Sequence, residues 1–454
     1  MLKNERIEIQ IDGMTSEGQG VGREAGFVVF VDGALVGEKV KVQIIKVAKS
    51  YAIGKLLEIV EASTMRQTPF CEVFGRCGGC ALQHMKYEAS LEFKAGVVRD
   101  ALARIAGISD SDVSRVVLPI IGMKSPLNYR NKAQYPVSIH PNGSMVSGFY
   151  AKRSHDVVSH KNCAIQHETS NQVREIVMSF IKKYSSEITI FNETSGKGLI
   201  RHILSRVGIN TGEVMVVIVA TSSKIPRQAE LVELLKGSIS GLKGVFVNVN
   251  SERTNIILGK KSIKIYGADQ IFETIGDLKF GISPLSFFQV NSIQTELLYS
   301  KAIEFAELSG RVLVYDLYCG TGTIGLFAAR NARKVIGVEI VPEAIVDARA
   351  NAAANGIINA EFGVGAAENI EFEADPSEVV VFLDPPRKGC EQSLLEKLVF
   401  ERPQRIVYVS CDPATLARDV KILLLGGFKL ESVQPFDMFP WCNDVEVVTL
   451  LSRE

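Results

Sequence analysis

Residues 312–339 read VLVYDLYCGTGTIGLFAARNARKVIGVE, and this segment is the best guide to the architecture of the chain. An apolar run ends at Asp316, a glycine-rich turn follows, and a second apolar run ends at Glu339, about 20 residues past the turn. Glycines at such a turn let the backbone approach a ligand, and the N-terminus of the next helix can face it. An acidic residue after the second strand is well placed to bind the hydroxyl groups of a ribose. The segment therefore predicts a nucleoside site beside a buried sheet.

The pattern of helix and buried strand continues over residues 285–454. Val379–Asp384 and Arg405–Ser410 are further apolar runs that end in polar residues, with helical stretches between them. This alternation is typical of an α/β fold with a parallel, doubly wound sheet, whose ligand lies beyond the carboxyl ends of the strands. The glycine spacing is not that of a dinucleotide fingerprint, because the third glycine, Gly325, falls where close helix packing explains it. We expect residues 285–454 to form a Rossmann-like domain.

Two other regions precede this domain. Residues 1–62 alternate short β-rich runs with glycine turns, which predicts a small antiparallel β-barrel. Such barrels often hold single-stranded nucleic acid, although a lysine-bearing sheet face is as often simply solvated. The lysines that would contact phosphates are Lys39, Lys41, Lys46 and Lys49. Residues 63–284 predict a central α+β domain, in which residues 87–106 form an amphipathic surface helix with the option of packing on the C-terminal domain.

The composition sets limits on the class of protein. A chain of 454 residues is longer than a single hydrophobic core usually supports, which predicts two to four domains. The 51 basic residues balance 51 acidic ones, and 46% of the residues are hydrophobic, as is usual for an enzyme. No apolar run approaches the roughly 18 residues of a membrane span, and the N-terminus lacks an apolar signal region. We expect a cytoplasmic protein without membrane contact or an obligate protein partner, whose eight cysteines favour metal binding, catalysis or packing over disulfides.

Cys411 is the strongest candidate for a catalytic residue. It follows the apolar run 406–409 and precedes Asp412-Pro413, the expected start of a helix whose N-terminus would lower the pKa of the thiol. Most cysteines are small buried hydrophobes, but this one accompanies Asp384-Pro-Pro-Arg387 at another strand end. Glu446 lies in an apolar run, where a carboxylate is costly to bury unless it is used. Together these residues indicate a methyl-transfer site.

Several motifs resemble those of a known family: Phe287-Phe-Gln-Val-Asn291, Asp316-Leu-Tyr-Cys-Gly320, Asp384-Pro-Pro-Arg-Lys-Gly389 and Ser410-Cys-Asp-Pro413. With the Glu446 segment they resemble the RNA 5-methyluridine methyltransferases, and most closely the bacterial 23S ribosomal RNA uracil-C5 methyltransferases with an N-terminal TRAM barrel. The resemblance covers nearly the whole chain. It implies a TRAM/OB-like barrel, a class I methyltransferase domain, an RNA substrate and S-adenosylmethionine as methyl donor. By position, the residues implied to contact S-adenosylmethionine are Gln289, Tyr318, Glu339 and Asp384.

The resemblance also implies a reaction. C5 of uracil is too poor a nucleophile to take a methyl group unaided, so a thiolate must first add at C6 and create an enolate. Cys411 matches this nucleophile, and Glu446 matches the base that removes the C5 proton. Arg387 and Lys388 either orient a phosphate or the enolate oxygen, or lie in a solvated loop. Three alternatives stay open: transfer-RNA uracil methylation, cytosine-C5 methylation, and a non-catalytic iron-sulfur RNA-binding factor, against which the presence of Cys411 and Glu446 argues.

Two further features concern the base and the RNA. The family commonly carries a histidine two residues before the base, whereas this chain has Asp444, whose charge would raise the pKa of Glu446. A base flipped out of structured RNA would find Phe287 or Phe288 near the site, although packing in the core is the commoner fate of an aromatic residue. The residues of the central domain that we expect to face RNA are Lys132, Arg201, His202 and Arg206.

A cysteine cluster lies in the central region. Cys71, Cys77 and Cys80 are spaced x5 and x2 apart, and Cys163 follows far along the chain. Thiolates at this spacing suit an iron-sulfur cluster or a tetrahedral zinc site. The spacing does not decide between the two metals, but the resemblance implies a [4Fe-4S] cluster held by these cysteines. Radical enzymes typically space their cysteines x3 and x2 apart, so the cluster is expected to be structural or to face RNA.

Overall fold

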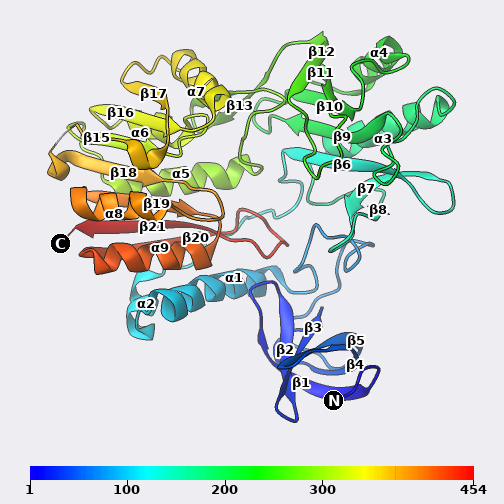
Figure 1. The fold of residues 1–454 in the computed structure, drawn as a ribbon, viewed down its shortest axis with the longest axis horizontal. Helices are drawn as coiled ribbons and strands as arrows, with labels where there is room; N and C mark the ends of the chain where they lie inside the picture. Colours follow the sequence, from blue (N-terminus) through cyan, green and yellow to red (C-terminus); the bar gives the residue numbers. More distant parts are fainter. Residues whose placement is uncertain (374, 454) are drawn as a thin grey trace.

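A computed structural model describes residues 1–373 and 375–453, and its ribbon has a lobe for each of three main sheets (Figure 1). The N-terminal strands form a small barrel, drawn in blue at one end of the molecule. The next lobe, in cyan and green, is built on a mixed sheet. The third lobe runs from yellow to red and carries a sheet with helices on both faces. The mixed α/β architecture expected from the sequence is therefore confirmed.

The N-terminal lobe is a closed barrel with the strand order β1-β2-β3-β5-β4. Its inward residues alternate with outward ones, so that Val40, Val42 and Ile44 are buried while Lys41 is exposed. The expectation of a purely antiparallel barrel was wrong in one pair, because β3 and β5 run parallel. A closed ring of an odd number of strands cannot alternate direction throughout. The strands are β1 Arg6–Met14, β2 Gln19–Glu24, β3 Phe27–Asp32, β4 Lys39–Val47 and β5 Tyr51–Glu61.

The middle lobe is organised by a sheet with the order β12-β11-β10-β9-β6-β7-β8. Every residue of its inner strands β9 and β10 is buried, so neither face of these strands is open to solvent. Its elements are β6 Lys132–Ile139, β7 Met145–Tyr150, β8 Val157–Ser159, α3 Glu168–Lys183, β9 Ile200–Val207, β10 Val214–Ala220, α4 Gln228–Ser238, β11 Leu242–Val249 and β12 Lys261–Gly267. A hairpin, β13 Ile271–Ile275 with β14 Leu278–Ile282, leads to the third lobe.

The third lobe contains the sheet β17-β16-β15-β18-β19-β21-β20. The strands from β17 to β19 run parallel, as expected for a doubly wound fold, and β21 and β20 complete the sheet in antiparallel fashion. Separate apolar clusters cover its two faces. Its elements are α5 Ser292–Ala306, β15 Leu313–Leu317, α6 Thr323–Ala329, β16 Lys334–Glu339, α7 Pro342–Ala354, β17 Ala360–Val364, β18 Val379–Leu383, α8 Gln392–Glu401, β19 Arg405–Ser410, α9 Pro413–Leu425, β20 Phe428–Phe436 and β21 Glu446–Arg453.

Helix α1, Tyr87–Ala101, belongs in sequence to the central region but lies along α9 and β20 of the third lobe (Figure 1). It continues into a π-helical turn, Leu102–Ala106, and a short helix α2, Asp110–Val116, follows. Lys94 and Asp437 form an ion pair of 2.5 Å with both side chains fully buried. Removing one partner of a buried ion pair strongly destabilises a protein, so this pair ties α1 to the end of β20. Across the described residues, none of the helices has the length and apolar character needed to span a membrane.

Candidate active site

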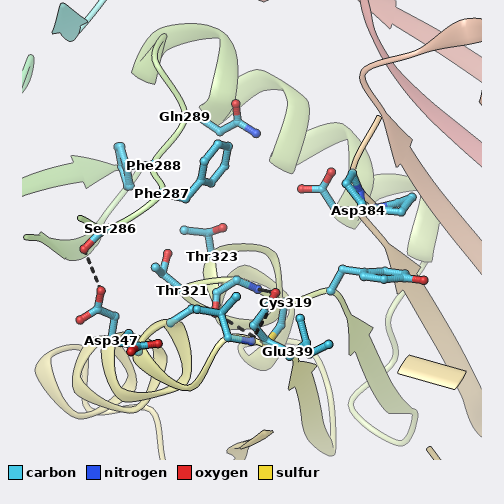
Figure 2. Close-up of a pocket in the computed structure, with 18 of the residues that line it drawn as sticks. Ser286, Phe287, Phe288, Gln289, Cys319, Thr321, Thr323, Glu339, Asp347 and Asp384 are labelled. Atoms are coloured by element: carbon cyan, nitrogen blue, oxygen red, sulfur yellow. Dashed lines mark hydrogen bonds between the residues drawn. The ribbon is translucent and has the colours of Figure 1, made fainter. Parts of the chain in front are cut away.

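A cavity of about 1180 Å³ opens at the carboxyl ends of the parallel strands (Figure 2). Because these strand ends meet at one edge of the sheet, the loops that follow them supply most of its walls. The residues expected from the sequence to serve the cofactor and the reaction all line this cavity: Gln289, Tyr318, Glu339, Asp384, Cys411 and Glu446. The structure therefore brings into one space six residues spread over more than 150 positions of sequence, from 289 to 446.

The turn after β15 is shaped to admit a ligand. Gly320 has a φ of 54°, and a Cβ added to it would meet no atom within 4 Å. Its backbone N–H donates to Glu339 at 3.2 Å, while the N–H of Val341 donates to the other carboxylate oxygen at 2.9 Å. Gly325 has a different task, because a Cβ there would lie 2.8 Å from Asp316 and 3.1 Å from Val335. The predicted packing role of the third glycine is thus confirmed.

The opposite wall of the cavity comes from the segment before α5. Figure 2 shows Phe287 and Gln289 on this wall, facing Asp384 across the cavity. Phe287 is 71% exposed, whereas Phe288 is buried against Phe280. Phe287 is therefore available for contact with a ligand, and Phe288 belongs to the core.

Asp347 was not among the residues expected in the site, yet it lines the same cavity. It accepts a hydrogen bond from the hydroxyl of Ser286 at 2.7 Å, which ties helix α7 to the segment before α5. The residue lies in a helix without a recognisable motif. Only its position one and a half turns after the start of α7, on the side facing the turn, could have indicated it.

Cys411 lies between β19 and α9, at the mouth of the cavity. The expected helix start is confirmed, because the Asp412 side chain accepts from the N–H groups of Ala414 and Thr415 at 2.9 and 3.0 Å. The expectation of a lowered thiol pKa was wrong for the protein alone. Burial and, to a smaller extent, the charges of Glu446 and Asp384 raise the pKa of Cys411 to about 12, against the opposing charge of Arg387. A thiolate here needs additional positive charge.

Glu446 is the first residue of β21 and is only 5% exposed. Burial, the largest cause, and the charges of Asp384 and Asp444 together raise its pKa to about 8, while Arg387 opposes them. The expected effect of Asp444 is therefore confirmed in direction, with burial as the larger cause. Burial likewise raises the pKa of Asp384 to about 7. The cavity thus holds carboxyl groups that exchange protons near neutral pH, as general bases commonly do.

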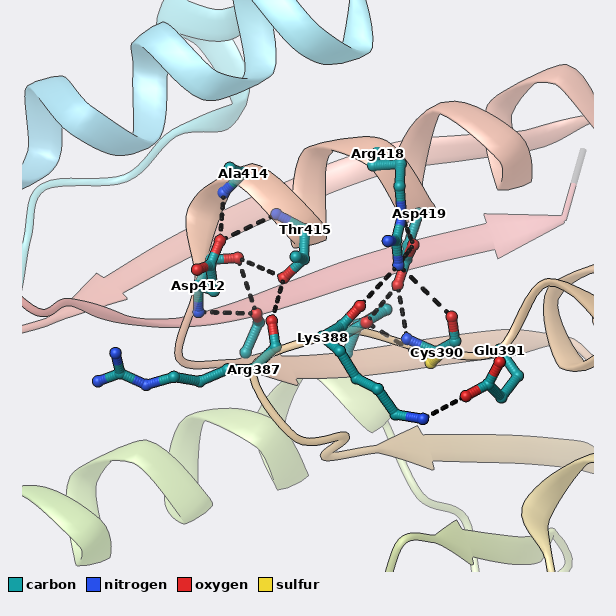
Figure 3. A network of polar contacts seen from close by, with 11 residues as sticks. Arg387, Lys388, Cys390, Glu391, Asp412, Ala414, Thr415, Arg418 and Asp419 are labelled. Carbon is teal, nitrogen blue, oxygen red and sulfur yellow. Dashed lines mark hydrogen bonds and ion pairs between the residues drawn. The ribbon is translucent and has the colours of Figure 1, made fainter. Parts of the chain in front are cut away.

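The loop after β18 is held against α9 by a buried polar network (Figure 3). Asp419, fully buried, accepts from the N–H of Cys390 at 2.8 Å and from the hydroxyl of Tyr408 at 2.7 Å. Arg418 donates to the carbonyl of Lys388 at 3.0 Å. Because α9 begins beside Cys411, this network fixes the distance between the two strand ends that form the mouth of the cavity.

Arg387 and Asp444 form an ion pair of 2.6 Å at the rim of the cavity. Asp444 stands where the resembling family commonly has a histidine, and Arg387 follows the Asp-Pro-Pro run. Lys388 instead pairs with Glu391 three residues on. The pair places one positive and one negative group beside Glu446 and Cys411, since both charges act on the pKa of Glu446.

The cysteine cluster surrounds a second cavity, of about 250 Å³. All the expected cysteines line it, and all are free thiols: Cys71, Cys77, Cys80 and Cys163. Cys442, which had no expected role, lines it as well. Within the part of the chain that the structure describes, no three His, Cys, Asp or Glu side chains are set closely enough to hold a metal ion as they stand. The structure therefore brings the thiols together around one cavity, but their present positions do not form a metal site.

The basic residues of β9 do not form a face for RNA. Arg201, His202 and Arg206 are at most 5% exposed, so the expectation that they face RNA was wrong. Arg201 donates to the carbonyl oxygens of Asn250 and Glu252 at 3.0 and 2.6 Å, and Arg206 donates to that of Ser286. They occupy a strand covered on both sides and serve to hold loops together. Of the barrel lysines, Lys39 and Lys41 pair with Glu8 and Glu58, while Lys46 and Lys49 are exposed.

The fold and the cavity define a class of protein, a methyltransferase that uses S-adenosylmethionine, and the comparisons with known proteins agree. Residues 251–454 match the profile of tRNA (uracil-5-)-methyltransferases, and residues 2–57 match the TRAM domain. A relative from Clostridium tetani, named an uncharacterized RNA methyltransferase, is 47% identical over 99% of this chain and 97% of its own. One from Bacillus cereus with the same name is 44% identical over 99% and 97%. The chain belongs to the RNA 5-methyluridine methyltransferase family.

A solved structure supports the same assignment. The tRNA (uracil-54, C5)-methyltransferase of Pyrococcus abyssi, determined in complex with S-adenosyl-L-homocysteine, aligns with a TM-score of 0.78 at 28% identity. The alignment covers 98% of this chain and 100% of that one. The protein is therefore a uracil-C5 RNA methyltransferase by family, with S-adenosylmethionine as its cofactor and RNA as its substrate.

Proposed function

We propose that the protein transfers a methyl group to C5 of a uridine in 23S ribosomal RNA through a covalent adduct with Cys411. The observation that carries this proposal is the sharing of one cavity by a thiol, a buried carboxyl group of raised pKa and a nucleoside-type glycine turn. Ribosomal RNA is favoured by the resemblance of the motifs to the bacterial 23S enzymes. Transfer RNA is the second candidate, because the solved structure that aligns over the full chain is of a transfer-RNA enzyme.

Gln289, Tyr318, Glu339 and Asp384 are proposed to hold S-adenosylmethionine. Glu339 already accepts from Gly320 and Val341, which orients its carboxylate at the end of β16, where ribose hydroxyls would reach it. The hydroxyl of Tyr318 is buried beside the cavity and finds no partner among the described residues. The bound cofactor supplies a methyl group on a positively charged sulfonium. A positive charge in this cavity would lower the pKa of Cys411 and of Glu446.

The proposed reaction begins at Cys411. Its thiolate attacks C6 of the uracil, a C6–S bond forms, and the π electrons of C5=C6 move into an enolate that ends at O4. C5 then takes the methyl group, and the electron pair of the broken bond stays on the cofactor sulfur. Glu446 accepts the C5 proton, the C5=C6 bond forms again and the C6–S bond breaks to release the thiolate. The positive charge of Arg387 lowers the pKa of Cys411, whereas the charges of Glu446 and Asp384 raise it.

We further propose that Cys71, Cys77, Cys80 and Cys163 hold a [4Fe-4S] cluster, with zinc as the alternative. Support comes from the cavity that these thiols surround and from an N–H donor in its wall that has no partner within the described chain, Arg130 Nε. Buried polar groups are rarely left without a partner, and the sulfides or thiolates of a cluster would accept from such donors. Anaerobic purification followed by iron, sulfide and zinc analysis tests the choice.

One assay separates the candidate functions. The purified protein is incubated with labelled S-adenosylmethionine and, separately, with ribosomal RNA and transfer RNA that lack 5-methyluridine, and the labelled nucleotide is then mapped. Label at a uridine of 23S RNA supports the proposal, whereas label confined to transfer RNA would support the second candidate, a transfer-RNA methyltransferase. Methylated cytosine, or no transfer to either RNA, would contradict both.

A further inference from the structure

Residues 437–445, which we call the base loop, connect β20 to β21 and end directly before Glu446. The loop lies between the two cavities, because Phe439 lines the large cavity, whereas Cys442 and Asp444 line the cysteine cavity. A loop shared between two cavities can transmit the state of one to the other only if it is held at both sides. Its contacts show that it is.

The cysteine segment holds the middle of the base loop through the backbone. The N–H groups of Ala81 and Leu82, directly after Cys80, both donate to the carbonyl of Trp441, at 2.9 and 3.0 Å. The thiol of Cys442 donates to the carbonyl of Gly79 at 3.1 Å. These contacts come from residues 79–82, so any shift of the chain around Cys80 moves the base loop with it.

Trp441 locks this arrangement through its side chain. The indole, 5% exposed, donates to the carbonyl of Pro126 at 2.8 Å and packs edge-on against Phe70 at 5.2 Å. Its backbone has a φ of 69°, a conformation that residues other than glycine adopt only when their surroundings hold them there. The loop is thus kept in a strained shape by Pro126 and Phe70, and by the packing of Trp441 with Cys80 and Cys163 of the cysteine cavity.

The active-site side of the loop is fixed by charged groups. Asp437 accepts from Lys94 at 2.5 Å and from Tyr87 at 2.7 Å. Asp444 lines the cysteine cavity, and its carboxylate accepts a hydrogen bond from Arg387 at 2.6 Å. Glu446 follows two residues later as the first residue of β21, where it pairs with Phe436, the last residue of β20, so the loop decides where the strand begins.

We propose that the base loop is a positioning device, in which the cysteine cavity and Trp441 set the place of Glu446 for the final proton removal. The inference rests on the proposed function and extends it. Cys411 is held separately, by β19 and by the Asp412 cap of α9. Disturbing the base loop should therefore leave formation of the C6–S bond and methyl transfer intact. It should slow the step in which Glu446 takes the C5 proton and the C6–S bond breaks.

The test uses the full-length protein, a short uridine-containing RNA substrate and S-adenosylmethionine in single turnovers, quenched and run on denaturing gels. The band of protein bound to RNA reports adduct formation and its decay. Cys442→Ala removes the contact with Gly79, and Trp441→Phe removes the bond to Pro126; neither residue is itself a proposed metal ligand. We expect the adduct to form at a rate within twofold of wild type and to decay about tenfold more slowly, since one positioning contact is worth this order. Phe180→Leu, in the buried face of α3, is the packing control and should leave the decay unchanged.

Metal content and melting temperature are measured on the same samples, so that a variant is compared only when folded. Slower decay supports the inference whether or not the metal content falls. Equal slowing of formation and decay, or decay as fast as wild type in both variants, would overturn it. If the wild-type protein forms no adduct, or forms one that Cys411→Ala retains, the proposed function fails instead. Should Cys442→Ala not fold, Trp441→Phe alone decides.

Discussion

The two cavities of this protein are built in different ways. The large cavity is assembled mostly at the ends of strands in one sheet, whose order and register hold those walls in place. The cysteine cavity is assembled from loops at residues 71–80, 163 and 442, which no common sheet holds together. Chemistry that needs fixed distances is supported by the first kind of site. The second kind is held by contacts between loops, such as that of Cys442 with Gly79, and the proposed metal would add to them.

The largest effect is expected at the wall made by β19. Cys411→Ala should lower methyl transfer to RNA by about a thousandfold or more and remove the covalent adduct, because the thiol that forms the C6–S bond is gone. Binding of S-adenosylmethionine, measured by calorimetry, should stay within twofold of wild type, since the turn at Gly320 does not depend on the thiol. Normal transfer by the variant would contradict the covalent route and the view of the large cavity as the reaction site.

Glu446→Gln is expected to have the next largest effect. The amide keeps the shape of the side chain but cannot take the C5 proton, so turnover should fall by about 10²–10⁴-fold while the adduct accumulates. The gel assay for adduct distinguishes this from Cys411→Ala, which has none. The melting temperature at pH 9 should rise, because the pKa of about 8 in the folded protein lies above that of the unfolded chain. Between the ordinary value of 4.5 and about 8 the native state keeps a proton that the unfolded chain has lost, so the wild-type protein loses stability as the pH rises through this window.

The cysteine cavity should respond in stability more than in chemistry. Cys77→Ser is expected to lose the proposed metal and lower the melting temperature by about 5–10 °C, since a ligand that binds only the folded chain stabilises it by a few kcal/mol. Metal analysis and a thermal melt measure both effects. Cys411→Ala serves as the matched control, because it removes a thiol outside this cavity and should keep the metal. A Cys77→Ser protein with the melting temperature of wild type would mean that the loops hold themselves, and the contrast between the cavities would disappear.

The sequence predicted the large cavity better than the small one for a physical reason. The runs ending at Asp316, Glu339 and Asp384 are parallel strands, and parallel strands bring their ends together regardless of what lies between them. The base loop follows no such rule. The contact of Cys442 with Gly79 joins residues 363 positions apart, and no periodicity indicates it.

The failures of prediction have the same origin. Arg201, His202 and Arg206 were expected on an open strand face because they are basic, but β9 has a neighbour on each side and cover on both faces. The pKa of Cys411 was expected to be low because of the helix start. That local effect is present at Asp412, yet burial and two carboxyl groups from other strands outweigh it. Both errors came from contacts between elements, which a single segment of sequence does not report.

The smallest expected effect lies where the two cavities meet, at Asp444. Asp444→Asn removes a negative charge that raises the pKa of Glu446, so the midpoint for adduct decay should move to lower pH, by less than about one unit, because burial is the larger cause. Decay accelerates with rising pH, since only the deprotonated Glu446 can take the proton. The loss of the pair with Arg387, itself 70% exposed, should slow the maximal decay by no more than about fivefold, the range of an exposed ion pair. The control is Glu431→Gln, because the side chain of Glu431 is 31% exposed, as is that of Asp444, and lies on the same sheet. It should change neither the midpoint nor the maximal rate of adduct decay. A midpoint that stays in place, or moves to higher pH, would show that Asp444 belongs to the cysteine cavity alone and does not act on the base.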